Sequence, residues 1–146
     1  METFTSIFIV LAISVLLSLI CWKLKMLTVG GAIASFAIGT FTGIVGSIEW
    51  FALLIVFSTT GFVVTKLDFE KKKRAGLQEG RNGERTAMNV IGVGLPPCII
   101  AAVAWLFQDL NYMIMSAAYI GTMAVATSDT IASEIGIRDD RVWLIT

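Results

Sequence analysis

Five long apolar stretches, separated by shorter polar segments, account for most of this 146-residue chain. They cover residues 4–22, 27–46, 51–65, 87–107 and 112–131. Several of them are long enough to cross a hydrocarbon core of about 30 Å as a helix. Helices are expected because a chain in lipid must satisfy its backbone hydrogen bonds internally. The pattern therefore predicts an all-α membrane protein, a polytopic bundle of about five transmembrane helices that forms a single integral membrane domain over residues 1–146.

The segment from residue 66 to residue 89 is the longest polar run in the chain and contains most of its basic residues. These are Lys66, Lys71, Lys72, Lys73, Arg74, Arg81 and Arg85. With five spans, this run, the turn at residues 23–26 and the C-terminal tail lie on one side of the membrane, and all 11 Lys and Arg residues fall there. Because basic loops stay in the cytoplasm, we expect a multi-pass protein of the cell membrane. Its N-terminus would lie outside, and the long basic loop between the third and fourth helices would be cytoplasmic.

The composition narrows the chemistry that the chain can perform. It contains no histidine, and its formal net charge is zero. Acid–base or metal chemistry is therefore left to carboxylates, lysines or the backbone. Zero net charge argues against nucleic acid as a partner. Cys21 and Cys98 lie in apolar stretches without a CxxC pair, which is typical of buried small apolar residues.

The basic segment is the first candidate site. Asp68 and Lys72 are spaced i, i+4, as are Glu70 and Arg74, and this spacing favours a short surface helix. The segment from Gly76 to Gly83 cannot easily continue this helix, and glycines beside arginines can present backbone N–H groups and guanidinium forks to phosphate. The Walker pattern GxxxxGK[ST] is not present. The plain alternative is a basic loop that only touches anionic lipid head groups.

The second candidate site lies near the end of the fifth span, in residues 126–136. Asp129 lies within or at the end of an apolar stretch. An ionisable residue there costs free energy, so it indicates a functional site. Ser133 shares a helix face with Asp129, and Glu134 lies off that face at a similar height. Two carboxylates opposite a basic, glycine-rich loop could hold Mg²⁺ against a phosphate. Alternatively, these carboxylates only pair with arginines of the loop.

Small and helix-breaking residues predict how the spans pack. Gly39 and Gly43 form a small-xxx-small pair that allows another helix to approach closely. The polar notch at residues 58–61 is explained by hydrogen bonds between helices. Pro96 and Pro97 remove two backbone donors and are expected to kink or break the fourth span.

The placement of charge favours chemistry at the membrane surface over transport. Coupled-transport sites usually lie near the midplane of the bilayer, and no charged residue is expected there. A substrate that is itself partly in lipid would meet the basic loop and the carboxylates at the cytoplasmic edge. Two alternatives remain, namely a small-solute transporter or permease fragment that uses backbone and hydroxyl groups, and a non-catalytic membrane scaffold.

Two runs of residues resemble a known family. The first is Gly80-Arg-Asn-Gly-Glu-Arg85 leading into Ala87-Met-Asn-Val-Ile91, and the second is Ala126-Thr-Ser-Asp-Thr-Ile-Ala-Ser-Glu-Ile-Gly136. Both resemble the DUF92/TMEM19 family of integral membrane proteins, which includes plant phytyl-phosphate kinases. Where this family usually has Gln-Val-Leu-Ala-Asn-Gly, the chain has Asn89 and Val93 in place of the glutamine and the asparagine. Family members continue with further spans, so the chain is expected to be the N-terminal part of a longer domain.

The resemblance implies transfer of phosphate from a nucleoside triphosphate, CTP or ATP, to a prenyl (phytyl-type) monophosphate at the cytoplasmic face, with Mg²⁺ as cofactor. Asp129 and Glu134 would then be the catalytic and metal-binding carboxylates. The phosphate- and nucleotide-binding residues would be Lys66, Arg81, Arg85, Asn89, Ser128, Thr130 and Ser133. The implied partners are a membrane lipid or prenyl phosphate, together with either a second copy of the chain or a missing C-terminal half.

Overall fold

The structure is a computed structural model that describes residues 2–67, 69–74, 76 and 83–136. In this part of the chain the regular structure is helical. The long helices are α1 (Glu2–Lys23), α2 (Val29–Phe41), α3 (Ile48–Lys66), α5 (Ala87–Leu106) and α6 (Tyr112–Gly136). The π-helical segment η1 (Thr42–Gly46) prolongs α2, and the short helix α4 (Phe69–Arg74) follows α3. The predicted all-α bundle is confirmed, and α4 is the predicted surface helix.

Four helical segments of the described chain are long and apolar enough to cross a membrane. They are Phe4–Lys23, Val29–Gly46, Ile48–Lys66 and Ala87–Leu106. Helix α6 is not among them because polar residues gather toward its C-terminal end, although it is the longest helix at 25 residues. At 1.5 Å per residue it extends about 37 Å, which is enough to cross a hydrocarbon core. A fifth span therefore stays a prediction.

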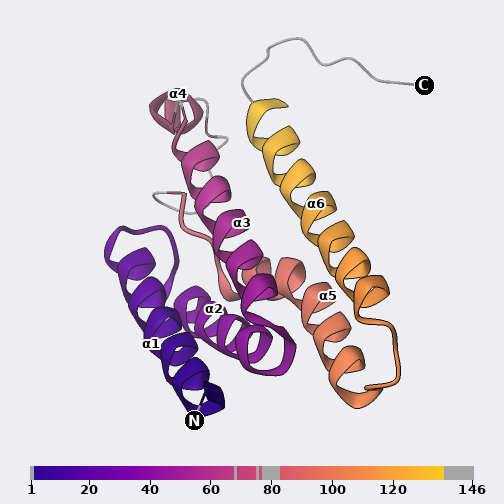
Figure 1. The fold of residues 1–146 in the computed structure, drawn as a ribbon. Coiled ribbons are helices and arrows are strands. Elements are labelled where there is room, and N and C mark those ends of the chain that lie inside the picture. The colour runs from indigo at the N-terminus through magenta and orange to yellow at the C-terminus, as the bar shows by residue number, and fades with distance from the viewer. Residues whose placement is uncertain (1, 68, 75, 77–82, 137–146) are drawn as a thin grey trace, which may run out of the picture.

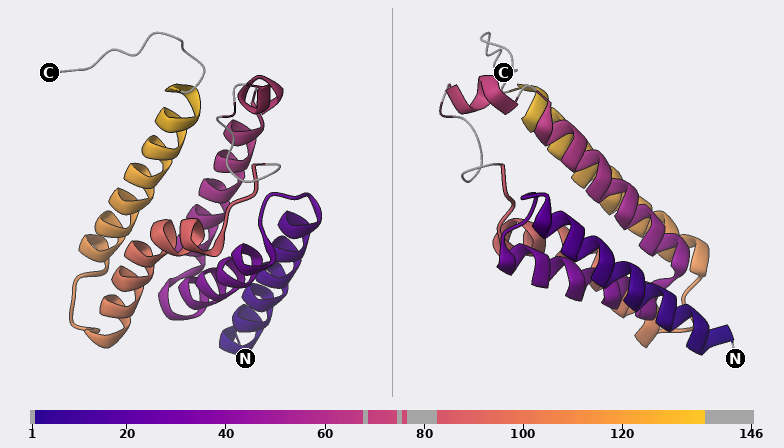
Figure 2. Two further views of the ribbon diagram at one scale, coloured as in Figure 1. Left: turned by 180° about the vertical axis from the view of Figure 1, so that it is seen from behind. Right: turned by 90° about the vertical axis from the view of Figure 1, so that its left-hand side faces the viewer.

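The helices form a bundle in which sequence neighbours run antiparallel (Figure 1). Helix α2 packs against α1 and α5, and α6 packs against α3 and α5. The N-terminus, the start of α3 and the turn between α5 and α6 lie at one end of the bundle (Figures 1 and 2). The turn between α1 and α2, helix α4 and the end of α6 lie at the other end. The described basic residues thus gather at one end, as the sequence predicts, and its assignment to the cytoplasm stays a prediction.

A buried cluster joins α3, α5 and α6. It consists of Trp50, Leu54, Phe57, Ala101, Tyr119 and Met123. The rings of Trp50 and Tyr119 stack with centroids 4.6 Å apart, and the Tyr119 hydroxyl donates a 3.0 Å hydrogen bond to the Trp50 carbonyl. This bond pairs a hydroxyl group that would otherwise be costly to bury. The cluster fixes α3 against α6, and another side of α3 is left to face α2 and α5.

Glycines and prolines shape the remaining packing. A Cβ atom at Gly43 would lie 2.5 Å from a Val10 methyl group, so the close approach predicted for this glycine of the second span is confirmed against α1. Helix α5 contains Pro96 and Pro97 and remains a single helix, but its two halves run in different directions (Figures 1 and 2). The prolines therefore kink the helix without breaking it, and Pro97 is fully buried.

Candidate functional site

The segments that precede α2 and α5 lie side by side. The Thr28 N–H group donates a 3.1 Å hydrogen bond to the Arg85 carbonyl, and the Arg85 N–H group donates a 2.9 Å bond to the Met26 carbonyl. These bonds form a single parallel bridge between Leu27 and Arg85. The bridge joins residues more than fifty positions apart in the sequence and brings the N-termini of α2 and α5 together.

Each of these two helices begins with a threonine cap. The Thr28 hydroxyl accepts a hydrogen bond from the Gly31 N–H group at 3.1 Å, and the Thr86 hydroxyl accepts one from the Asn89 N–H group at 3.4 Å. Such caps satisfy backbone donors that the first turn of a helix leaves unpaired. The Thr86 hydroxyl also donates to the side-chain oxygen of Asn89. Asn89, predicted to bind phosphate, therefore takes part in the cap of α5.

Gly31 allows the bridge to form. A Cβ atom at this position would lie 2.5 Å from the Arg85 carbonyl oxygen, which is much too close. The backbone of Arg85 therefore lies directly over the first turn of α2. Since both the bridge and this contact hold the Arg85 backbone, the start of the Arg85 side chain is also fixed.

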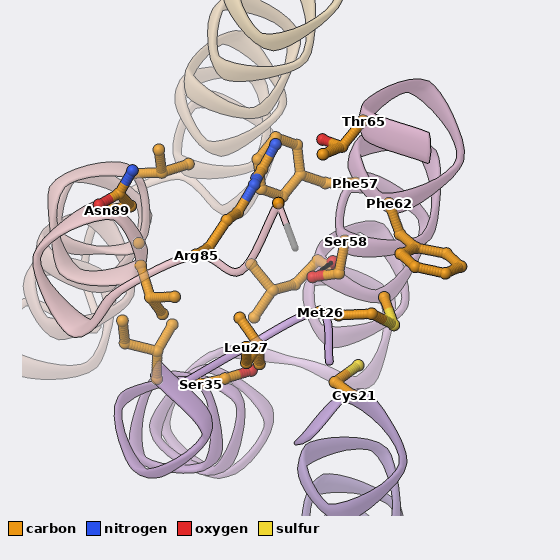
Figure 3. Close-up of a pocket in the computed structure, with 16 residues that line it drawn as sticks. Cys21, Met26, Leu27, Ser35, Phe57, Ser58, Phe62, Thr65, Arg85 and Asn89 are labelled. Atoms are coloured by element: carbon orange, nitrogen blue, oxygen red, sulfur yellow. Dashed lines mark hydrogen bonds between the residues drawn. The ribbon is translucent and has the colours of Figure 1, made fainter. Parts of the chain in front are cut away.

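A cavity of about 90 Å³ opens beside the bridge, between α2, α3 and α5. Figure 3 shows its labelled lining residues, with the Arg85 side chain extending across it toward α3. The polar side chains of Thr65, Ser58 and Asn89 line it together with Arg85. Further along the same helices the lining becomes apolar. This part includes Ile38, Leu54, Phe57, Val90 and Val93.

The Arg85 guanidinium group rests on the bare backbone of α3. A Cβ atom at Gly61 would lie 3.2 Å and 3.3 Å from its two terminal nitrogens. Among the described residues, the hydrogen bonds of Arg85 are made by its backbone and not by its side chain. A guanidinium group has five N–H donors in a planar fork that matches phosphate or carboxylate oxygens. Its half-buried position in the cavity is suited to binding an anion.

The contact with Gly61 gives a first testable prediction. A Gly61→Ala variant should bind a phosphate ligand several-fold more weakly, because the new methyl group pushes the guanidinium group away from α3. The fold should be kept, since the displaced group is the far end of a flexible side chain. Affinity for geranylgeranyl monophosphate, measured by native mass spectrometry, checks this. Gly92→Ala is the control, because a Cβ atom at Gly92 meets nothing within 4 Å, and equal affinities in both variants would contradict the placement of Arg85.

A hydrogen bond links helix α6 to the cavity. The Thr65 hydroxyl, which lines the cavity, donates a 2.7 Å bond to the Glu134 carboxylate. Asp129 and Ser128 are exposed, and no residue of α6 lines the cavity. Thr130 is buried at 8% exposure. The structure thus brings Arg85, Asn89 and, through Thr65, Glu134 together, whereas Asp129 lies apart from them.

The remaining predicted residues fall in three environments. Ser133 is exposed and donates a 3.0 Å hydrogen bond within its own helix, to the Thr130 carbonyl. The Lys66 ammonium group lies over the rings of Phe62 and Phe69, 5.8 Å and 5.0 Å from their centroids. Arg81 lies outside the described residues. The roles predicted for these side chains stay predictions.

The described carboxylates do not form a complete magnesium site. Mg²⁺ is usually bound by one or two carboxylates together with water and substrate phosphates. In residues 2–67, 69–74, 76 and 83–136, no group of three His, Cys, Asp or Glu side chains could hold a metal ion. Glu134 accepts the bond from Thr65, while Asp129 is exposed at a different angle on α6. These residues alone therefore do not complete a Mg²⁺ site, and Mg²⁺ as a cofactor stays a prediction.

The sequence predicts hydrogen bonds between helices at the notch of residues 58–61. For two of its hydroxyls this is wrong. Ser58 donates to the Leu54 carbonyl at 2.9 Å and Thr59 donates to the Ile55 carbonyl at 2.8 Å, both within α3. The notch matters instead because Gly61 makes room for Arg85. The feature of the sequence that points to Gly61 is its position next to three hydroxyl residues, Ser58, Thr59 and Thr60, in an apolar span.

The helices and the cavity define a polytopic helical membrane protein with a basic side chain in a cavity inside its bundle. The chain matches the model of the family described as integral membrane protein DUF92 over residues 12–146, and it belongs to this family. The resemblance seen in the sequence is thereby confirmed.

Three curated relatives show the extent of the similarity. An uncharacterized membrane protein of Methanocaldococcus jannaschii, MJ0933, is 33% identical over 100% of this chain and 59% of its own length. Protein PGR of Arabidopsis thaliana is 30% identical over 96% of this chain and 53% of its own length. The uncharacterized membrane protein sll0875 of Synechocystis is 28% identical over 64% of this chain and 39% of its own length. The chain thus spans about half the length of these relatives. No match to a solved structure was found.

Proposed function

We propose that this chain forms the part of a prenyl-phosphate kinase-like membrane protein that binds the phosphate acceptor. The observation that carries the proposal is the Arg85 guanidinium group, which extends into a cavity with polar and apolar lining and has no side-chain partner among the described residues. A prenyl monophosphate has the matching chemistry, with an anionic head and a single hydrocarbon chain.

The surroundings of Arg85 strengthen its attraction for a phosphate. A hydrogen bond to an ionised group is about twice as strong as one between neutral groups, and electrostatic interactions gain strength where water is partly excluded. Thr65 and Ser58 also line the cavity, but their hydroxyl groups donate to Glu134 and to the Leu54 carbonyl, so the attraction rests on Arg85. The apolar residues further along α3 and α5 would contact the first part of the hydrocarbon chain. A free phosphate would lack that contact.

In the proposed reaction Arg85 acts on the acceptor. A phosphate oxygen of the prenyl monophosphate attacks the γ-phosphorus of CTP or ATP and forms a new P–O bond. The bond from the γ-phosphorus to the bridging oxygen of the nucleotide breaks, and the nucleoside diphosphate leaves with that oxygen. Phosphoryl transfer depends mainly on positioning and on neutralisation of charge. Arg85 would orient the acceptor phosphate and neutralise part of its charge.

An assay of transfer tests this proposal. The purified chain in lipid nanodiscs is incubated with geranylgeranyl monophosphate, MgCl₂ and either CTP or ATP, and the prenyl diphosphate is measured by mass spectrometry. Product formation supports the kinase-like function. Binding of the monophosphate without product would limit the proposal to binding of the acceptor. Failure to bind the monophosphate would overturn it.

The role predicted for Asp129 gives a further prediction. If Asp129 acts at the site of transfer, Asp129→Asn should lower turnover by about 10²-fold or more, the range typical of a catalytic acid or base, while insertion into the membrane is kept. Turnover is compared with that of Asp109→Asn, which removes a carboxylate from the turn between α5 and α6 at the opposite end of the bundle. Wild-type turnover in the Asp129→Asn variant would remove Asp129 from the site.

A further inference from the structure

Ile38 of α2 and Gly94 of α5 line the cavity where these two helices pack together. A Cβ atom at Gly94 of α5 would lie 2.5 Å from the Ile38 Cδ1 atom and 3.0 Å from its Cγ2 atom. The side chain of Ile38 therefore occupies the space that the missing side chain of Gly94 leaves free. Ile38 and Gly94 both line the cavity, and Ile38 also packs against the buried cluster around Trp50.

The contact between Ile38 and Gly94 lies deep in the bundle relative to Arg85. Ile38 comes ten residues after the cap Thr28, which is about 15 Å along α2 at the usual helical rise. Gly94 comes eight residues after the cap Thr86, about 12 Å along α5 by the same rise. The two helices start together at the bridge to Arg85, so Ile38 and Gly94 line the part of the cavity that lies deeper in the bundle.

The size of the cavity limits what it can hold. Its volume of about 90 Å³ is smaller than the roughly 150 Å³ of an engineered apolar cavity that accepts benzene. There is room beside Arg85 for the first few carbons of a chain. A longer chain needs the Ile38 side chain to move off Gly94. Ile38 resists such movement because a β-branched side chain in a helix strongly prefers one χ1 rotamer.

We propose that Ile38, seated on Gly94, is the residue that determines the chain length of the phosphate amphiphile held at Arg85. The inference rests on the proposed function, because it assumes that the head group of the ligand lies at the guanidinium group. Ile38 acts on the hydrocarbon chain and not on the phosphate. A smaller side chain at position 38 deepens the cavity and favours longer chains, with little effect on the head group.

The test compares two ligands that share a head group, isopentenyl monophosphate with five carbons and geranylgeranyl monophosphate with twenty. Their dissociation constants are measured by native mass spectrometry for the wild type, Ile38→Val and Ile38→Ala. Burial of one further methylene group strengthens binding about fourfold. The preference for the long chain over the short one should therefore rise about fourfold in Ile38→Val and at least tenfold in Ile38→Ala. Non-specific uptake of the long chain by lipid is the same in all variants and cancels.

Ile33→Ala is the matched control, because Ile33 lies on the same helix and is 64% exposed. The preference of this variant for the long chain over the short one should equal that of the wild type. Ile38→Val keeps most of the packing, so it tests the inference even if Ile38→Ala unfolds. An unchanged preference in Ile38→Val, with both ligands still bound, would overturn the role of Ile38 and leave phosphate binding intact. If the wild type bound neither ligand, the proposed function itself would fail.

Discussion

An Arg85→Gln variant should bind geranylgeranyl monophosphate about 10- to 150-fold more weakly than the wild type, because a hydrogen bond to a charged group contributes about 1.5–3 kcal/mol. The guanidinium group extends into the cavity, and among the described residues the hydrogen bonds of Arg85 are made by its backbone and not by its side chain. Glutamine keeps a polar side chain of moderate length but removes the charge and the planar fork. Titration of the protein in nanodiscs, followed by native mass spectrometry, measures this loss.

Two variants and one ligand separate binding at the cavity from general attraction to basic residues. Arg85→Lys keeps the charge without the fork and should show an intermediate affinity. Arg74→Gln removes an exposed charge from α4 and should bind like the wild type. Geranylgeraniol, which has the same chain without phosphate, should bind equally to the wild type and to Arg85→Gln. Equal loss of affinity in Arg74→Gln and Arg85→Gln would show that the ligand responds only to the total positive charge at the end of the bundle where both residues lie.

Gly31→Ala should have the largest effect on stability. The added methyl group would lie 2.5 Å from the Arg85 carbonyl oxygen, and this neighbour is backbone, which cannot turn aside. Overpacking of this kind costs about 1–3 kcal/mol. We expect the free energy of unfolding to fall by this amount in reversible denaturation in mixed micelles. Because Arg85 must shift, affinity for the prenyl monophosphate should fall as well.

The adjacent glycine provides a matched control. A Cβ atom at Gly30 would meet the Cβ atom of Ala87 at 3.4 Å, an ordinary contact. Gly30→Ala makes the same chemical change one residue away, so it corrects for the general effect of replacing a helical glycine. We expect its stability and affinity to be close to those of the wild type. If both variants had the same stability, the bridge at Arg85 would not hold the two helices together.

Much of the fold could be predicted from the sequence, because each long helix coincides with an apolar run. The errors are local. The sequence predicts the third span at residues 51–65, but α3 already begins at Ile48, where the Ser47 side chain accepts a hydrogen bond from the Trp50 N–H group at 3.3 Å. Glu49 and Trp50 lie between the second and third predicted spans, although they belong to the first turn of a capped helix. The π-helical segment η1 has no marker in the sequence that would separate it from α2.

The candidate site could be predicted only in part. Arg85 was a candidate because it belongs to a basic, glycine-rich segment. The direction of the Arg85 side chain could not be predicted, because it depends on the bridge to Met26 and Thr28 and on the open space at Gly61. These are contacts between distant segments, and no local pattern encodes them. Asp129 was a candidate because a charge near the end of an apolar span is unusual, but this signal does not tell which way the side chain faces.

Photoaffinity labelling tests the central claim most directly. A geranylgeranyl monophosphate analogue with a diazirine on its first isoprene unit is irradiated with the protein in nanodiscs, and the labelled peptides are identified by mass spectrometry. If the cavity beside Arg85 binds the ligand, labels will appear at its lining, on Leu54, Phe57 or Val93. Excess unlabelled monophosphate will suppress them, and they will be lost in Arg85→Gln. Labels confined to exposed residues such as Met113 and Val125, unaffected by the competitor, would contradict the assignment of this cavity as the binding site.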